Sequence, residues 1–219
     1  GLAVIKKRKP DYGFLWGAVD SSGKIIIPIE YDYLGSLSEG LMNFQKDKKS
    51  GFLDKKNKIV IPAMYDNFSA FSGGLAAVKF SETGKYGYID KNNTLVIAAE
   101  YEDANPFFGG FTSVAKKKGY TTGSAGKGTA NVPGQWVVIN KNGKVIQERS
   151  FDGVSPLNAG GLFIIESNGK KGTMNTQGMP ILPMEYTDVT IDKSGYTVFK
   201  TIGTKKYGMM NNVGSIIVA

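Results

Sequence analysis

The chain has 219 residues, a formal net charge of +8, and neither cysteine nor histidine. This composition excludes disulfides, thiolate nucleophiles, histidine general bases and zinc sites built from His or Cys. No apolar run reaches the roughly 18 residues of a membrane-spanning helix, and no signal peptide is visible. The lysine excess suits an anionic partner, or simply solubility.

One segment returns six times along the chain. Its first copy reads Trp16-Gly17-Ala18-Val19-Asp20, and every copy ends on Asp or Asn, at positions 20, 54, 90, 140, 175 and 211. A period in this range indicates an array of supersecondary units. The chain opens on Gly1-Leu2-Ala3, which copies Gly74-Leu75-Ala76 from inside a repeat. We therefore expect a further segment upstream of residue 1.

Each repeat contains four short segments in the same order. In the second copy these are a Gly-Leu strand (40–44), the strand of the Trp-Gly position (50–54), an apolar strand that ends at Pro (59–62) and an aromatic-acidic segment (65–68). The runs are rich in β-branched and aromatic residues and are bounded by Gly, Asn, Asp and Pro, which is typical of strands. We predict antiparallel pairing of 41–44 with 52–54, and of 52–54 with 59–61.

The link between the second and third strands reads Asp/Asn-x-x-Gly/Asn. The first side chain can accept hydrogen bonds from the backbone ahead of it, and the last residue tolerates the left-handed conformation that closes a short hairpin.

Large residues recur at two positions of the repeat. We expect them to pack between neighbouring repeats, because each repeat is too small to bury a core alone; the alternative is an exposed aromatic ladder for sugars or bases. They are Tyr31, Tyr65, Tyr101, Phe151 and Tyr186, and, six residues later, Leu37, Phe71, Phe107 and Leu157.

Most of the lysines lie between the first and second strands of the repeats. Aligned in a stacked array, they would form a basic ridge able to hold a polyanion. The plainer interpretation is that lysine suits hairpin tips and protects strand edges. Arginine binds phosphates and bases through two hydrogen bonds at once and is preferred over lysine for that purpose. It occurs only twice in this chain, so specific nucleic-acid binding is not expected. The ridge residues are Lys6, Lys7, Arg8, Lys9, Lys46, Lys48, Lys49, Lys79, Lys85, Lys116, Lys117, Lys118, Lys127, Lys170, Lys171, Lys200, Lys205 and Lys206.

The fourth copy alone carries an insertion, over residues 117–134. In repeat proteins such insertions map to loops on one face, often the binding face, and long loops are usually functional or disordered. The candidate ligand contacts are therefore Lys117, Lys118, Tyr120, Lys127 and Trp136.

These motifs together resemble the WG-repeat family of bacterial β-rich repeats. The resemblance rests on the aromatic-Gly pair, the Asp-x-x-Gly turn, the Ile-Pro strand end and the Tyr-Asp that follows. The chain departs from the pattern at Ser50, Val137, Glu148 and Lys171. The family implies a repeat domain without assigned chemistry or cofactor, often presumed to be an interaction module. The repeat-defining residues are Trp16, Gly17, Asp20, Gly51, Asp54, Tyr65, Tyr86, Gly87, Asp90, Tyr101, Asn140, Tyr186 and Gly208.

We predict an all-β domain over residues 1–219 with six repeats of about 35 residues, each a small β-meander. The repeats are expected to stack in an open, curved or twisted array; a closed, six-bladed propeller-like ring is the alternative. Their approximate bounds are 1–39, 40–73, 74–109, 110–160, 161–194 and 195–219.

The function predicted is a non-catalytic module for protein–protein interaction or scaffolding, as a monomer or as part of a longer chain. A polyanion- or glycan-binding module at a bacterial cell surface is the alternative, and a secreted, periplasmic or surface location is favoured. A carboxylate glycoside hydrolase is a distant third, since a catalytic pair should be unique whereas the acids here recur. Those acids are Glu30, Asp32, Glu100, Glu102, Asp103, Glu185 and Asp188. No catalytic or metal-ligating residue and no cofactor is expected.

Overall fold

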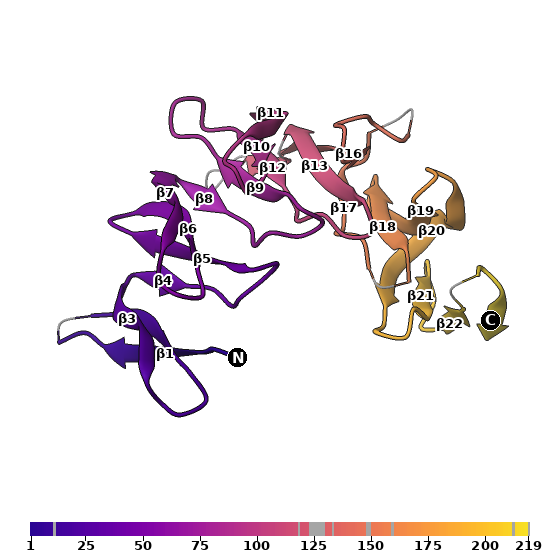
Figure 1. Cartoon of the computed structure of the whole chain (residues 1–219). Helices are drawn as coiled ribbons and strands as arrows, with labels where there is room; N and C mark the ends of the chain where they lie inside the picture. The colour runs from indigo at the N-terminus through magenta and orange to yellow at the C-terminus, as the bar shows by residue number, and fades with distance from the viewer. Residues whose placement is uncertain are drawn as a thin grey trace. The chain divides into compact units, whose positions relative to one another are not determined.

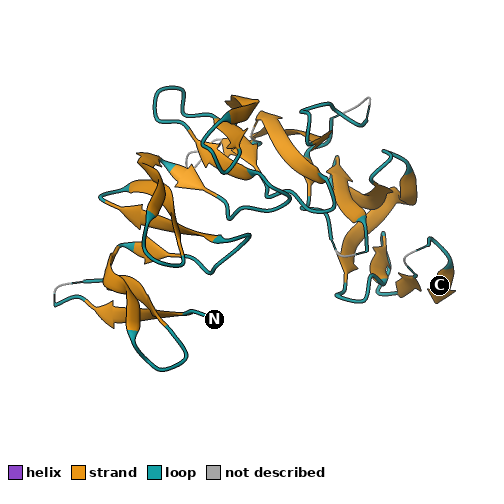
Figure 2. Ribbon diagram, in the orientation of Figure 1, coloured by secondary structure: helices purple, strands orange, loops and turns teal. Residues whose placement is uncertain are grey.

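The structure is a computed structural model. It describes residues 1–10, 12–117, 119–122, 130–132, 134–147, 150–158, 160–211 and 213–218, and only the backbone at 120–122 and 130–132. Every regular element in these ranges is a strand, and every pairing between strands is antiparallel (Figure 2). Across the same ranges, no helix has the length and apolar character needed to cross a membrane.

The chain divides into two compact units, Gly1–Glu100 and Tyr101–Ala219 (Figure 1). The first unit holds three antiparallel meanders. Their strands are β1 (Ala3–Arg8), β2 (Phe14–Val19) and β3 (Ile25–Tyr31); β4 (Tyr33–Leu34), β5 (Leu41–Lys46), β6 (Lys49–Asp54) and β7 (Ile59–Tyr65); and β8 (Asn67–Phe68), β9 (Ala76–Lys79), β10 (Tyr86–Ile89) and β11 (Leu95–Tyr101).

The predicted pairings are confirmed. Leu41 faces Asp54 across β5 and β6, and Phe52 faces Ile61 across β6 and β7. The short strand β4 comes from the aromatic-acidic segment of the preceding sequence repeat, yet it pairs with β5 of the next one. Consecutive repeats are therefore joined by backbone hydrogen bonds as well as by side-chain packing.

The second unit holds a smaller meander, a separate hairpin and one seven-stranded sheet. Its strands are β12 (Asp103–Ala104), β13 (Phe111–Lys117) and β16 (Gln135–Asn140); the hairpin β14 (Tyr120–Thr122) and β15 (Ala130–Val132); and β17 (Gly153–Val154), β18 (Leu162–Ser167), β19 (Lys170–Asn175), β20 (Pro180–Ile191), β21 (Thr197–Thr201), β22 (Tyr207–Met210) and β23 (Ile216–Val218). None of the sheets formed by the described residues closes on itself.

The turns between second and third strands have the predicted chemistry. The Asp54 carboxylate accepts hydrogen bonds from the backbone N–H of Lys56 at 2.8 Å and of Lys58 at 2.9 Å. Asn57 closes the turn with φ of 67°. The same pair of bonds is made by Asp20, Asp90, Asn140, Asn175 and Asn211.

The repeated aromatics form the core, as predicted, with two exceptions. Tyr65 and Phe71 are 3% and 1% exposed and share a cluster with side chains from two successive repeats. Leu37 is instead 43% exposed. Phe71 packs on the Phe52 ring at 4.7 Å between centroids, whereas the residue equivalent to Phe52 beside Leu37 is the small Ala18. The prediction that every repeated large residue is buried is therefore wrong at Leu37.

Tyr186 is the second exception, since it is only half-buried. It lies in the middle of β20, a single strand of 12 residues. The equivalent Tyr65 ends its strand, whereas β20 continues past Tyr186 to Ile191, with an irregularity in its pairing with β21 between Tyr186 and Asp188.

Candidate functional site

Several lysines of the predicted ridge are engaged within the chain. Lys9, Lys49 and Lys171 pair with Asp32, Asp66 and Asp188 at nitrogen–oxygen distances of 2.9, 2.6 and 3.5 Å. Each acid follows a repeat aromatic or lies two residues after one. The hydrogen bond from Lys9 holds the pKa of Asp32 below its ordinary value. Three of the acids considered for hydrolysis, Glu30, Asp32 and Asp188, thus serve as lysine partners.

Other lysines stack on the aromatic residue of the Trp-Gly position. The Lys6 ammonium lies 5.4 Å from the Trp16 ring centroid, and Lys79 lies 5.8 Å from that of Tyr86. Both pairs face each other directly across a hairpin. The sequence analysis missed this pairing, although a lysine five residues after the Gly-Leu start of a repeat (Lys6, Lys79) and the aromatic residue before the repeat glycine (Trp16, Tyr86) are its signal.

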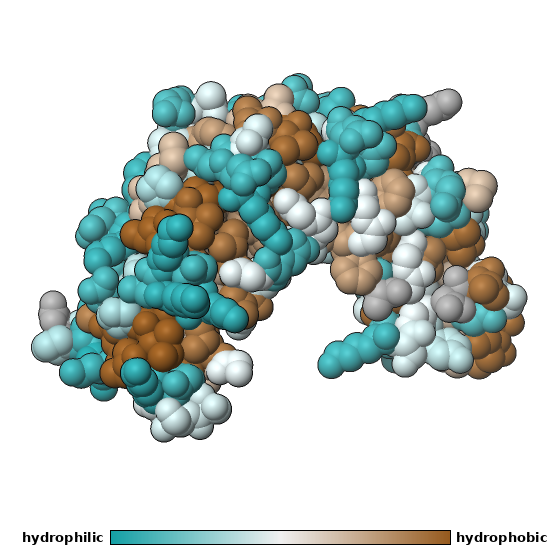
Figure 3. All heavy atoms as spheres, in the orientation of Figure 1, coloured by the Kyte–Doolittle hydropathy of each residue, from teal (hydrophilic) through white to brown (hydrophobic). Residues whose placement is uncertain are grey.

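These contacts leave fewer free ammonium groups than the sequence suggests. On the face drawn in Figure 3, hydrophilic side chains are interleaved with hydrophobic ones in each unit. The repeat lysines described above therefore act first in local packing and pairing.

The fourth repeat breaks the pattern in its second and third strands. In four repeats a glycine of the second strand lets the third strand approach closely: Gly17, Gly51, Gly87 and Gly172. An added Cβ at Gly51, for example, would lie 2.5 Å from the Ile61 carbonyl oxygen. The fourth repeat has Val137 at this position, buried at 5% exposure. Among its described residues the third strand is reduced to two isolated bridges, Ile139 with Val145 and Trp136 with Phe151.

Gln147 occupies the position where the other repeats place a buried aliphatic residue such as Ile61, which is 0% exposed. Its Oε1 accepts a hydrogen bond from the backbone N–H of Val138 at 3.1 Å. Its Nε2 is buried and has no hydrogen-bond partner among the described residues. A polar side chain thus replaces a core residue and substitutes for a strand hydrogen bond.

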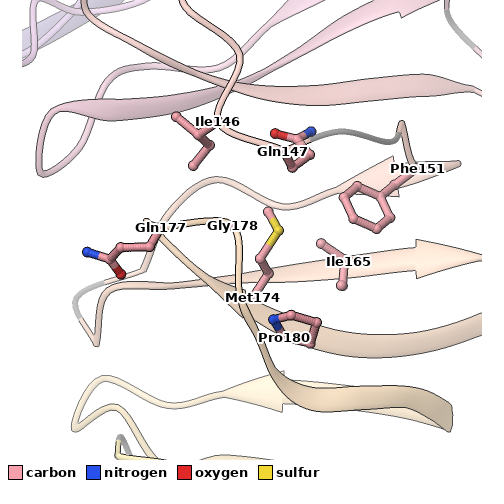
Figure 4. A pocket seen from close by; sticks show the side chains of 8 residues that line it. All are labelled: Ile146, Gln147, Phe151, Ile165, Met174, Gln177, Gly178 and Pro180. Atoms are coloured by element: carbon pink, nitrogen blue, oxygen red, sulfur yellow. The ribbon is translucent and has the colours of Figure 1, made fainter.

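A pocket of about 650 Å³ lies beside this residue, at the junction of the fourth and fifth repeats. Its apolar lining is Ile146, Phe151, Ile165, Met174 and Pro180, and its other lining residues are Gln147, Gln177 and Gly178. Figure 4 shows the Met174 side chain projecting toward the loop of Ile146 and Gln147, whereas the Gln177 side chain points away. The lining residues named here, all from the described part of the chain, include no ionisable side chain.

Of the predicted ligand contacts, only Lys117 and Trp136 have side chains within the described part of the chain, and neither lines this pocket. Lys117 is exposed at the end of β13, and Tyr120 begins the two-stranded hairpin β14–β15 of the insertion. Lys118 and Lys127 lie outside the described residues. Trp136 is half-buried against the cluster that includes Phe151. Its backbone exchanges both hydrogen bonds with Phe151, at 2.8 and 2.9 Å, so it supports the pocket without lining it.

Comparison with curated protein sequences gave no match. Among solved structures, the chain is similar to a eukaryotic initiation factor, with TM-score 0.49 and 12% identity over 83% of this chain and 52% of that one. It is similar to Hsv2 from Kluyveromyces lactis, with TM-score 0.47 and 11% identity over 82% and 58%. It is also similar to virginiamycin B lyase from Staphylococcus aureus, with TM-score 0.42 and 14% identity over 99% and 87%. The chain thus spans little more than half the length of the first two.

A family profile gives a direct assignment. The profile described as "WG containing repeat" matches residues 16–49, 51–82, 86–120, 136–170 and 172–201, which together make up most of the chain. Each match begins at or beside the aromatic-Gly position and includes the Asp or Asn turn and the segments that follow. With its antiparallel meanders and repeated turns, the chain belongs to the family of WG-containing repeat proteins.

Proposed function

We propose that this chain is a non-catalytic binding or scaffolding module that contacts a protein partner through its fourth repeat. One observation carries the proposal: the fourth repeat alone combines an insertion, a third strand reduced to two isolated bridges among its described residues, and a polar residue at a core position. Most of the other repeats use the same positions for packing and turn formation. A departure concentrated in one unit is expected where a repeat protein acquires a specific ligand.

The proposed absence of catalysis rests on the roles of the acids. The carboxylates of the repeat turns accept backbone hydrogen bonds, and several of those after the aromatics pair with lysine. Such bonds favour the ionised form, which suits neither a general acid nor a carboxyl group poised near neutrality.

The six-repeat, open arrangement is part of the same proposal. The profile matches five repeats. The sixth is supported by the pairing of β22 with β23 and by the turn bonds of Asn211. An open array is favoured by the repeat length, because propeller blades commonly need about 40–50 residues. Small-angle X-ray scattering would distinguish an extended array from a ring.

The partner site is tested by removing the insertion. Residues 119–133 are deleted and the hairpin is closed with Asn-Gly, which suits a two-residue turn. Wild type and deletion variant are screened on protein and glycan arrays, and the hits are measured by calorimetry. We expect the fold to persist and binding to protein hits to weaken.

A matched control changes a different turn. Lys55→Ser with Lys56→Ser gives the second repeat the turn sequence of the first, Ser21-Ser22, and should leave binding unchanged. If the deletion unfolds the protein, the insertion is a structural part of the fourth repeat. If it folds and binds unchanged, the proposed location of the site is wrong.

Polyanion binding is the second candidate, and the net charge of +8 favours it. It predicts retention on immobilised heparin that falls steeply with salt and weakens when an exposed pair of ridge lysines, Lys205 and Lys206, is changed to serine.

A further inference from the structure

We propose that the outer edge of β11, in the third repeat, binds an extended segment of a partner protein by strand addition. The segment pairs antiparallel with β11 and carries a basic residue opposite Glu100. The inference rests on the proposed function only in that the ligand belongs to a protein. It adds a second contact surface, outside the fourth repeat.

In three repeats a proline interrupts the third strand. The first, second and fifth repeats have Pro28, Pro62 and Pro183, and all three prolines are exposed. The third repeat has Ala98 at the same position of β11. The equivalent position of the fourth and sixth repeats lies outside the described residues. Among the repeats that can be compared, β11 therefore differs at this position from the other third strands.

The direction of the backbone at this position follows from the repeat glycines. An added Cβ at Gly87 would lie 2.8 Å from the carbonyl oxygen of Ile97, so this carbonyl points toward β10. No peptide bond in the described chain is cis, and in a trans peptide the next N–H points away from the carbonyl. The Ala98 N–H therefore faces outward from the sheet. The equivalent carbonyls also lie within 2.6 Å of an added Cβ, and a proline follows each of them: Ile27, Ile61 and Leu182.

Ala98 thus keeps a hydrogen-bond donor that proline removes. Proline cannot donate to an added strand, and natural sheets use it to protect their edges. β11 is the end strand of its sheet, and no strand among the described residues pairs with its outer side. Because alternate residues of a strand face the same way, Glu100 also presents its backbone there. A ladder of this length is sufficient in this fold, since β4 joins β5 through Tyr33 and Leu34.

The side chains beside the open edge indicate what the added strand carries. Leu95 and Val96 are 47% and 46% exposed. The Glu100 side chain is exposed and forms no ion pair with another described residue. In strand addition the backbone hydrogen bonds supply affinity and the side chains supply specificity, and opposite charges directly across a ladder are favourable. An extended apolar segment with a lysine or arginine opposite Glu100 fits both features.

The test uses a capped pentapeptide, acetyl-Lys-Val-Thr-Val-Thr-amide, whose β-branched residues favour an extended strand. In the antiparallel register its lysine lies opposite Glu100 and its central threonine opposite Ala98. A control peptide is N-methylated at the central threonine, so it lacks the N–H that would donate to the Ala98 carbonyl. The readout is the amide signal of Ala99 in protein with isotopically labelled alanine. Ala63, which follows Pro62 in β7, is the reference.

We expect saturable shifts of Ala99 with the plain peptide, no shift of Ala63, and an affinity at least about tenfold lower for the methylated peptide. Ala98→Pro gives the third repeat the residue of three others and should weaken the plain peptide at least about tenfold. Ala98→Gly keeps the N–H and should bind as wild type does. Glu100→Gln should weaken the plain peptide about two- to fivefold.

The two peptides on wild-type protein decide the inference even if Ala98→Pro fails to fold. No shift of Ala99, or equal affinity for the plain and methylated peptides, overturns it. Unchanged binding by a folded Ala98→Pro variant overturns it too, because the peptide would then bind elsewhere.

The deletion of residues 119–133 separates this inference from the proposed function. That deletion leaves the sequence of β11 unchanged, so the variant should bind the peptide as wild type does. Array hits lost in the deletion variant, with no peptide binding by wild type, would leave the proposed function standing and this inference wrong. Peptide binding at Ala99 with array hits unchanged by the deletion would do the reverse.

Discussion

Gly51 shows what the glycine of the Trp-Gly pair does. A methyl group there would meet the Ile61 carbonyl oxygen at 2.5 Å and the Pro62 carbonyl carbon at 2.7 Å. Both are backbone atoms of β7, so neither can rotate away. We expect Gly51→Ala to lower the free energy of unfolding by about 1–3 kcal/mol, as overpacking does, in urea denaturation.

The control is Gly153→Ala. Gly153 also lies in a strand, but the nearest atom to an added Cβ is Glu166 Cβ at 3.8 Å, which is ordinary contact. Equal losses in the two variants would show that glycine is retained at position 51 for some other reason.

Asp54 predicts a pH dependence of stability. Hydrogen bonds from the backbone N–H groups of Lys58 and Lys56 hold the pKa of its carboxyl group below its ordinary value. The unfolded-state pKa is about 3.9. The stabilising contribution is therefore complete above that pH and is lost as the pH falls through the lower folded-state pKa.

The natural turns of this chain supply the matching variant. Asn140 makes the same two bonds with an amide oxygen that does not titrate. We expect Asp54→Asn to keep the fold and to lose less Tm than wild type on acidification below about pH 4. Asp54→Ala should be less stable than Asp54→Asn at every pH. An unchanged acid response in Asp54→Asn would contradict the assignment.

At the scale of elements, hydrogen bonds link the turns of the second and third repeats to the repeat before each of them. The Tyr65 hydroxyl donates to Asn93 Oδ1 at 2.7 Å, and Tyr31 donates to Asn57 at 2.8 Å. A double-mutant cycle of Tyr65→Phe and Asn93→Gly should measure a coupling of about 0.5–1.5 kcal/mol. Glycine suits the φ of 64° at Asn93, so the turn itself is preserved. Additive effects would mean that the bond does not contribute.

Unfolding of the two compact units can be measured separately by the fluorescence of the chain's two tryptophans. Trp16 lies in the first compact unit and Trp136 in the second. Tyr65→Ala removes a buried ring from the first unit and should cost about 3–5 kcal/mol, with loss shared by neighbouring repeats because they supply each other's core.

The measurement uses two single-tryptophan backgrounds, Trp136→Phe and Trp16→Phe. We expect the Trp16 fluorescence to report a loss of about 3–5 kcal/mol in the free energy of unfolding. The Trp136 fluorescence provides the comparison from the second unit. An unchanged Trp16 transition would mean that the Tyr65 ring does not support the core, and the aromatic-ladder interpretation would gain.

The sequence by itself determined the strands, their antiparallel order and the turn chemistry. Asp54 bonds to residues two and four positions ahead, and a short turn makes adjacent strands pair, so these features depend on neighbours in the chain. The repeat also indicated which aromatic residues form the core, because identical positions in successive units meet identical surroundings.

Only the tertiary structure decided which positions break that rule. Leu37 is exposed, and the first repeat has Ala18 where the second has Phe52, which packs on Phe71; this is a difference between units rather than within one. The pocket at Gln147 likewise depends on residues from two repeats. The substitutions at 137 and 147 are visible in the sequence, but the space and the unpaired donor that they create arise from contacts distant along the chain.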